Sequence, residues 1–273
     1  MKKLTANQIK TLNKQKSITK LLYIIKILRD PINGCPWDIK QNYTSLSQYP
    51  IEEAYELQEA VEKNDIINIK EELGDLLLQV VLFSEIGSEK KHFNFDKVAE
   101  EISNKLIRRH PQIFDRNYKK NDTPKETWEK IKLEEKKNKK NSDFYSILED
   151  VPNNMPALIR SVKIQKKASL INFDWDDYKG VLKKLDEEMC ELKLALKAQN
   201  NKNHIEEELG DLMFTIVSLS RHLKLNPEKV LNNSIKKFKN RFLYVEKKIY
   251  DKKINVNNNK NVLNKYWKEA KKI

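Results

Sequence analysis

The sequence predicts an all-α protein with duplicated helical-bundle domains, and three observations support this prediction. Only 5 of its 273 residues are glycine, which disfavours folds that depend on many tight turns. Apolar residues recur at intervals of three and four residues, the spacing of one helix face. An acidic motif near residue 52 also returns near residue 187. We therefore expect a helical chain that contains one kind of domain twice.

The repeat consists of two short acidic motifs that follow each other in both halves of the chain. In the first half, Glu-Glu-Ala-Tyr-Glu begins at Glu52 and Glu-Glu-Leu-Gly-Asp begins at Glu71. In the second half, Glu-Glu-Met-Cys-Glu begins at Glu187 and Glu-Glu-Leu-Gly-Asp begins at Glu207. The spacing between the copies is about half of the chain, so a whole domain is duplicated.

Residues 1–17 are expected to form a basic N-terminal extension, because the first 20 residues carry six lysines and no acidic residue. The first domain is expected over residues 18–115. Two apolar stripes with a break at Asn64 and Asp65 predict a helical hairpin within it. The stripes contain Ala54, Leu57 and Val61, and then Ile69, Leu73, Leu76, Val80 and Phe83.

Residues 116–155 are expected to form a charged linker, since lysine runs, Pro124 and Pro152 interrupt the apolar pattern there, and Pro156 follows directly. The second domain is expected over residues 156–273, with the same hairpin and a break at Asn200 and Asn201. Its stripes contain Leu185, Met189, Leu192 and Leu196, and then Ile205, Leu209, Met213, Ile216 and Ser220.

Gly74 and Gly210 occupy the same position in the two copies, inside the second stripe. A glycine in a helix costs about 1 kcal/mol relative to alanine. We therefore expect both to allow close helix packing or to leave room for a ligand. Two stripes per copy also leave more apolar surface than one hairpin can bury, which predicts a homodimer.

The charge balance of 53 basic and 40 acidic side chains is unevenly distributed. The basic excess lies in residues 1–20, 116–141 and 236–273, while residues 21–115 are acidic. This pattern argues against a uniformly basic nucleic-acid surface, and the scarcity of glycine excludes glycine-rich phosphate loops. Cys35 and Cys190 provide no disulfide framework, and no apolar run approaches the roughly 20 residues of a membrane span. We expect a cytoplasmic protein without a membrane segment.

The acidic motifs predict a metal site. Glu187, Glu188 and Glu191 lie within one arc of a helix, and a hairpin brings them toward Glu208 and Asp211. Convergent carboxylates without histidine or cysteine suit Mg²⁺, or Mn²⁺, rather than zinc. The histidines (His92, His110, His204 and His222) lack metal-ligand spacing. The first copy offers a possible second metal site with the set Glu53, Glu56, Glu72 and Asp75.

These motifs resemble the MazG family of all-α nucleoside triphosphate pyrophosphohydrolases, in its two-domain bacterial form. The resemblance covers about residues 18–273. It also includes Gly-Cys-Pro-Trp-Asp from Gly34, Arg-Arg-His-Pro from Arg108 and Phe-Asp-Trp from Phe173. At residue 240 the chain has an asparagine where the family usually has arginine.

The resemblance implies Mg²⁺-dependent cleavage of nucleoside triphosphates to the monophosphate and pyrophosphate, chiefly by the second copy. It implies Glu188, Glu191, Glu208 and Asp211 as metal ligands, and Lys184, Lys237, Arg241 and Trp267 as nucleotide contacts. Glu187 is the expected acceptor of the proton from the attacking water. Nucleic acid is not required for this activity.

Two alternatives stay open at this point. One is a house-cleaning enzyme restricted to damaged or modified nucleotides, because no residue sets base preference. The other is a helical RNA-binding or regulatory protein, in which the basic tail binds nucleic acid and the acidic cluster is structural. Mg²⁺-dependent pyrophosphate release identifies the enzymes, whereas steeply salt-dependent RNA binding identifies the binding protein.

Overall fold

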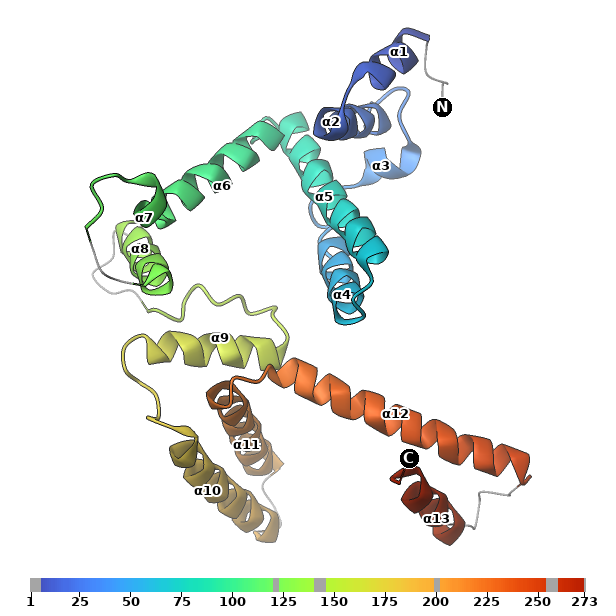
Figure 1. Ribbon diagram of the computed structural model, residues 1–273, viewed down its shortest axis with the longest axis vertical. Helices are drawn as coiled ribbons and strands as arrows, with labels where there is room; N and C mark the ends of the chain where they lie inside the picture. The colour runs from blue at the N-terminus through green and yellow to red at the C-terminus, as the bar shows by residue number, and fades with distance from the viewer. Residues whose placement is uncertain (1–5, 120–122, 140–145, 199–201, 254–259, 273) are drawn as a thin grey trace. The chain divides into compact units, whose positions relative to one another are not determined.

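The computed structural model describes residues 6–119, 123–139, 146–198, 202–253 and 260–272, and these residues form helices and loops without a strand (Figure 1). The all-α prediction is confirmed. The helices are α1 (Ala6–Lys14), α2 (Ser17–Leu28), α3 (Pro36–Lys40), α4 (Tyr49–Glu62), α5 (Ile66–Glu89), α6 (Phe95–Arg109), α7 (Pro111–Phe114), α8 (Pro124–Lys139), α9 (Ala157–Ser169), α10 (Tyr178–Lys197), α11 (Lys202–His222), α12 (Pro227–Asp251) and α13 (Lys260–Ala270).

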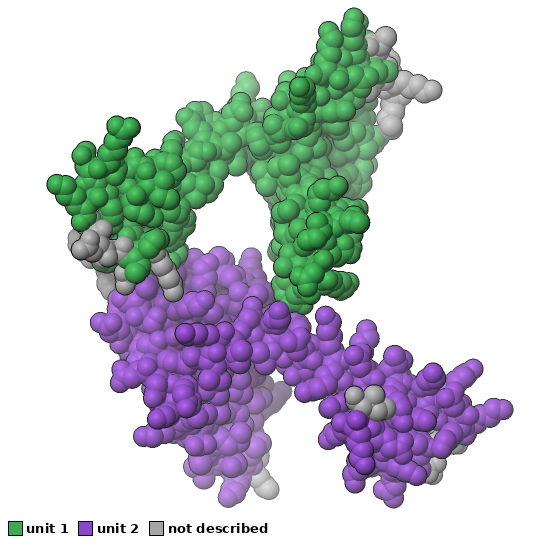
Figure 2. Space-filling view, viewed as in Figure 1, with its two compact units in different colours: residues 1–135 green, residues 136–273 purple. Residues whose placement is uncertain are grey.

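The chain divides into two compact units, Met1–Glu135 and Lys136–Ile273 (Figure 2). Helices α4 and α5 of the first unit correspond to α10 and α11 of the second, because each pair carries the same two acidic motifs. Each pair forms a helical hairpin. Within the parts of the chain that the structure describes, none of the helices is long and apolar enough to cross a membrane.

The turn of the first hairpin lies where the sequence predicts it. Asn64 adopts a left-handed backbone conformation with φ 54°, which asparagine tolerates better than most residues. Asp65 then caps α5 by accepting a hydrogen bond from the backbone N–H of Asn68. The corresponding break at Asn200 and Asn201 lies outside the described residues.

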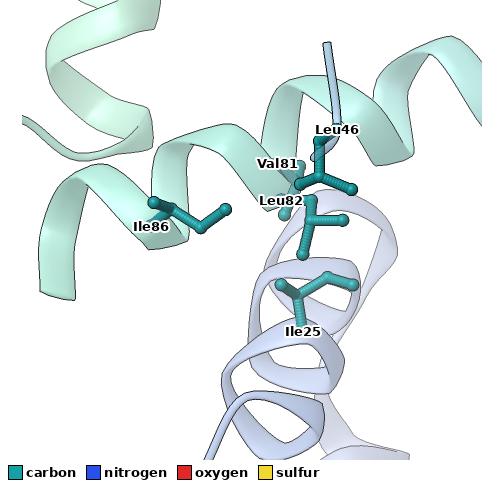
Figure 3. Close-up of a cluster of buried hydrophobic side chains, with 5 residues drawn as sticks. All are labelled: Ile25, Leu46, Val81, Leu82 and Ile86. Carbon is teal, nitrogen blue, oxygen red and sulfur yellow. The ribbon is translucent and has the colours of Figure 1, made fainter. Parts of the chain in front are cut away.

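A buried apolar cluster holds the first unit together (Figure 3). Ile25 of α2 and Leu46 of the loop before α4 contact Val81, Leu82 and Ile86 of α5. Burying an aliphatic side chain of this size contributes about 1.5–3 kcal/mol, so the cluster fixes α2 and the loop against α5. The hairpin that carries the first acidic motifs is anchored by this core.

The expected linker over residues 116–155 contains a packed helix, α8. Trp128 lies against the His110 ring, with ring centroids 5.1 Å apart, and under the Arg109 guanidinium. Glu135 forms ion pairs with Arg108 and Arg109 at 2.5 and 2.7 Å. These contacts attach α8 to the end of α6, and the boundary between the two units falls inside α8.

In the second unit, α9 is tied to its neighbours by buried polar side chains. Gln165 Nε2 donates to the Phe214 carbonyl of α11 at 2.9 Å. Lys167 donates to the Ile147 carbonyl at 2.9 Å and pairs with Asp150 at 2.5 Å. Gln165 and Lys167 are both at most 7% exposed, and these partners compensate for the desolvation of their polar groups.

The apolar stripes of the second copy are only partly buried within the described residues. Met189 and Leu196 of α10 are 38% and 56% exposed, whereas Val181, Glu188 and Ala195 are buried. On α11, Leu209, Met213 and Ile216 are also exposed. Of the α10 carboxylates, Glu188 therefore faces inward and Glu191 is exposed. Within the described residues, Met189 and Leu196 remain exposed.

Candidate metal and nucleotide site

The α10–α11 hairpin brings three carboxylates together. Glu188 and Glu191 lie on α10, and Glu208 lies on α11. One oxygen of each lies within 4.8 Å of one oxygen of the other two. A three-residue spacing places both α10 side chains on one face, and the antiparallel partner helix supplies the third. We call this group the second-copy triad.

Two of the predicted acidic residues lie outside this triad. Asp211 is exposed, about one turn after Glu208 on α11. Glu187 has a side chain 56% exposed, and it pairs with Lys184 rather than with the triad. The roles of Asp211 as a metal ligand and of Glu187 as the proton acceptor remain predictions.

Lys184 is the basic residue at the second-copy triad. Its Nζ atom lies 2.8 Å from Glu188 Oε1 and 2.5 Å from Glu187 Oε1. Hydrogen bonds to Glu187 and then to Glu188 are the largest causes that raise the pKa of Lys184. Since Glu188 is 4% exposed, its charge needs a nearby cation, and Lys184 supplies one.

His204 also contacts this triad, although its sequence spacing gave no metal-site pattern. Its Nδ1 lies 3.3 Å from Glu208 Oε1, one helical turn later on α11. The signal that identifies it is the four-residue interval between histidine and glutamate on a predicted helix. Both the Glu188 and Glu208 carboxylates therefore have a nitrogen-bearing neighbour one turn earlier in the chain.

The first copy contains an equivalent group, which we call the first-copy triad. Oxygens of Glu53, Glu56 and Glu72 lie within 4.8 Å of one another, and Asp75 is not part of this group. Desolvation, followed by repulsion from neighbouring carboxylates, raises the pKa of Glu53 and of Glu72. In both triads the donors are hard oxygens that repel one another, which fits Mg²⁺ or Mn²⁺.

Three of the four predicted nucleotide contacts, all except Lys184, lie on the α12–α13 hairpin. Lys237 and Arg241 line a hollow of about 710 Å³, together with Tyr244 and Lys247. Trp267 of α13 packs against Phe238 of α12, with ring centroids 5.2 Å apart. The structure thus groups these side chains on one helix pair, while the triad lies on another.

A second hollow, of about 490 Å³, lies between α9, α11 and the loop before α10. Its walls are mainly apolar and include Phe173, Trp175 and Phe214. At its edge Arg221 pairs with Asp174 at 2.7 and 2.5 Å. The Phe-Asp-Trp motif therefore connects the loop before α10 to α11.

The comparison with protein families covers both hairpins. The family model described as the MazG nucleotide pyrophosphohydrolase domain matches residues 41–114 and again residues 177–245. The chain belongs to the MazG family. The two matches contain both triads, and they confirm the predicted duplication.

Curated relatives of the MazG family match most of the chain. The nucleoside triphosphate pyrophosphohydrolase/pyrophosphatase MazG of Thermotoga maritima is 43% identical over 256 residues, which cover 92% of this chain and 94% of that protein. The nucleoside triphosphate pyrophosphohydrolase of Escherichia coli K12 is 40% identical over 232 residues, which cover 84% of this chain and 87% of that protein.

Proposed function

We propose that this MazG-family chain is a cytoplasmic enzyme that hydrolyses nucleoside triphosphates to the monophosphate and pyrophosphate with Mg²⁺. The observation that supports this most is the second-copy triad, which lies within a MazG-domain match and beside a lysine suited to phosphate. The names of the two relatives point to the same reaction.

The side chains of the second copy suit distinct parts of this reaction. Glu188, Glu191 and Glu208, with Asp211, would hold the cation, and Mn²⁺ would serve in place of Mg²⁺. A bound cation of this kind supplies charge neutralisation at phosphate oxygens and lowers the pKa of water. Lys184, Lys237 and Arg241 bind phosphate, Trp267 stacks on the base, and Glu187 accepts the proton of the attacking water.

The second copy is proposed as the main catalytic copy. In it, Lys184 and the basic residues of α12 are available to the triphosphate, whereas the first copy has Tyr49 at the position of Lys184. Without a phosphate-binding lysine, the first copy is able to hold a cation but lacks the group that positions the substrate.

Matched substitutions in the two copies test this assignment. We expect Glu188→Gln to lower pyrophosphate release by about 100-fold or more, because it removes a charged ligand of the catalytic cation. Glu53→Gln is the control in the first copy and should lower the rate by less than threefold. Release from the unaltered chain should stop when EDTA is added. The assignment of the catalytic copy is wrong if Glu53→Gln abolishes the reaction and Glu188→Gln does not.

The preferred base and sugar follow from a separate measurement. A panel of common and modified triphosphates, assayed for pyrophosphate release with Mg²⁺, distinguishes a broad enzyme from a house-cleaning enzyme. Similar kcat/KM values across the panel support broad hydrolysis. A preference of about 100-fold for one modified base supports the restricted function.

A homodimer is proposed because several helices expose apolar side chains. On α12, Leu231, Ile235, Phe238 and Phe242 are all at least 45% exposed and lie along one side of the helix. On α11, Leu209, Met213 and Ile216 add a second exposed apolar row. Exposed apolar area of this kind is typical of a surface covered by a partner, and a second copy of the chain is the occupant that we propose.

A further inference from the structure

Lys184 forms an ion pair with Glu188, one of the proposed metal ligands. Glu188 is among the most buried charged residues, at 4% exposed, and its carboxylate is paired with Lys184 at 2.8 Å. The same ammonium group reaches Glu187 at 2.5 Å, so it bridges two carboxylates. The Lys184 side chain is 34% exposed, and its four-carbon stem allows the ammonium group to move without any change in the backbone.

The first copy lacks this arrangement. The residue at the position of Lys184 is Tyr49, whose ring lies edge-on to Trp37 with ring centroids 6.2 Å apart. In the part of the chain that the structure describes, no basic side chain forms an ion pair with the first-copy triad. The two triads thus have the same donors and different countercharge.

We propose that Lys184 is a tethered counter-cation that competes with the metal ion for Glu188 and transfers to the triphosphate when the substrate binds. This inference rests on the proposed function for the identity of the substrate. A lysine that leaves Glu188 for a phosphate oxygen gives up one anionic partner and gains another. The departure also frees a ligand of the triad.

The consequence is coupling between two binding events at the second copy. Without nucleotide, a cation that binds Glu188 must displace Lys184 and lie near its positive charge. With nucleotide, Lys184 has a phosphate partner, and the triad is free for the cation. By linkage, each ligand then increases the affinity for the other by the same factor. The first copy has no such lysine, so its triad binds a cation independently of nucleotide.

Mn²⁺ titration of the full chain, followed by electron paramagnetic resonance, measures this competition without relying on activity. The background Glu56→Gln with Glu72→Gln removes the first-copy site, so that the signal reports the second-copy triad. In that background we expect Lys184→Met to tighten Mn²⁺ binding about tenfold in the absence of nucleotide, since a partly exposed charge near the triad is removed.

Lys183→Met is the matched control, because it removes the same charge from an exposed neighbouring position on α10. It should change the Mn²⁺ affinity by less than about twofold. Lys184→Met should also reduce the factor by which Mn²⁺ improves binding of a non-hydrolysable triphosphate analogue, measured by calorimetry. Unchanged or weaker Mn²⁺ binding in Lys184→Met, relative to Lys183→Met, overturns the proposal.

Circular dichroism with and without Mn²⁺ establishes that the variants are folded. Lys184→Gln serves as a second variant if the methionine variant aggregates, and the same tightening is expected of it. The opposite background, Glu191→Gln with Glu208→Gln, isolates the first-copy triad. It should bind Mn²⁺ about tenfold more tightly than the second-copy triad without nucleotide, and its affinity should not change when the analogue is added. Equal affinities of the two triads contradict the proposal.

These outcomes are distinguishable from failure of the proposed function. If no triphosphate yields pyrophosphate but Lys184→Met still binds Mn²⁺ more tightly, the competition for Glu188 stands and the substrate assignment is wrong. If the chain hydrolyses triphosphates and Lys184→Met does not bind Mn²⁺ more tightly, the function stands and the counter-cation proposal is wrong.

Discussion

Arg29 is the most completely buried arginine in the first unit, and it links three segments of the chain. Its guanidinium pairs with Glu89 of α5 at 2.5 and 2.7 Å and donates to the carbonyls of Asp38 and Gln41. The Arg29 side chain is 5% exposed, while that of Glu89 is 38% exposed. Loss of this arginine would remove a donor from both carbonyl groups, and the Asp38 carbonyl would keep only its bond from the backbone N–H of Gln41.

We expect Arg29→Met to lower the free energy of unfolding by about 3 kcal/mol. This is the lower end of the range for a broken buried ion pair, because the half-exposed Glu89 is resolvated by water. Urea denaturation measures the loss. Lys26→Met, an exposed change one turn earlier on α2, should alter stability by less than about 0.5 kcal/mol. Equal effects of the two substitutions would contradict the structural role of Arg29.

Glu135 gives the stability of the first unit a dependence on pH. A hydrogen bond from Arg109 is the largest cause that lowers the pKa of Glu135 to about 2, and Arg108 adds to it. A pKa below the unfolded value of 4.5 means that the stabilisation is complete above about pH 4.5 and is lost as the pH falls toward 2.

We expect Glu135→Gln to be less stable than the unaltered chain at pH 7, because the glutamine has no charge to pair with the arginines. The difference between the two free energies of unfolding should narrow as the pH falls from 5 toward 2. Denaturant titrations at several pH values measure it. A difference that stays constant with pH would show that the carboxylate charge of Glu135 does not stabilise α8.

At the scale of the helix, three glycines in similar α-helical settings have opposite surroundings. A methyl group on Gly87 of α5 would lie 2.8 Å from the Phe93 ring and 2.9 Å from the Phe93 carbonyl. For Gly74 and Gly210, no described atom lies within 4 Å of the added methyl group. Close packing against described residues therefore accounts for Gly87, and it does not account for Gly74 or Gly210. The other explanation, that the glycine leaves room for a ligand or a partner, therefore applies to Gly74 and Gly210.

Alanine substitutions separate these two cases. Gly210→Ala should raise the free energy of unfolding by about 1 kcal/mol, the helix-propensity difference, because the added methyl group lies in open space. Pyrophosphate release should fall, because this open space is the room that we assign to a ligand or a partner. Gly87→Ala should lower the free energy of unfolding, because the backbone carbonyl of Phe93 must move. Thermal unfolding and the pyrophosphate assay measure both variants. Destabilisation by Gly210→Ala would contradict the open surroundings of that residue.

The sequence predicted the helices better than it predicted which sides they bury. The interval between acidic motifs and the Asn64–Asp65 turn identify the hairpins, because spacing and turn chemistry are local properties. The burial of Glu188 and the exposure of Met189 were not predictable from the apolar pattern. An apolar stripe indicates a surface that is buried in the functional protein. It does not indicate whether the same chain or a partner buries that surface. Helix α8 was not predicted, because its sequence is rich in lysine and contains few residues, such as Trp128, that pack against the end of α6.

At the scale of the whole molecule, the exposed apolar row of α12 predicts self-association. We expect the chain to sediment as a dimer and Ile235→Asp to shift it toward the monomer, since a buried unpaired carboxylate is costly at an interface. Asn233→Asp places the same charge on the other side of α12 and should leave the dimer intact. Sedimentation velocity measures all three proteins. Dimers of equal strength in both variants would exclude this side of α12 from the interface.

The boundary between the two units, after Glu135, falls within a continuous helix and not in a loop. A gene fragment that stops at codon 115 would encode a first copy without Trp128 and Glu135. The arginines at the end of α6 would then lose these partners and be exposed to solvent. A fragment that runs to codon 139 keeps the whole of α8. Recombination that shuffled these domains between relatives would therefore succeed more often with a crossover after this helix than before it.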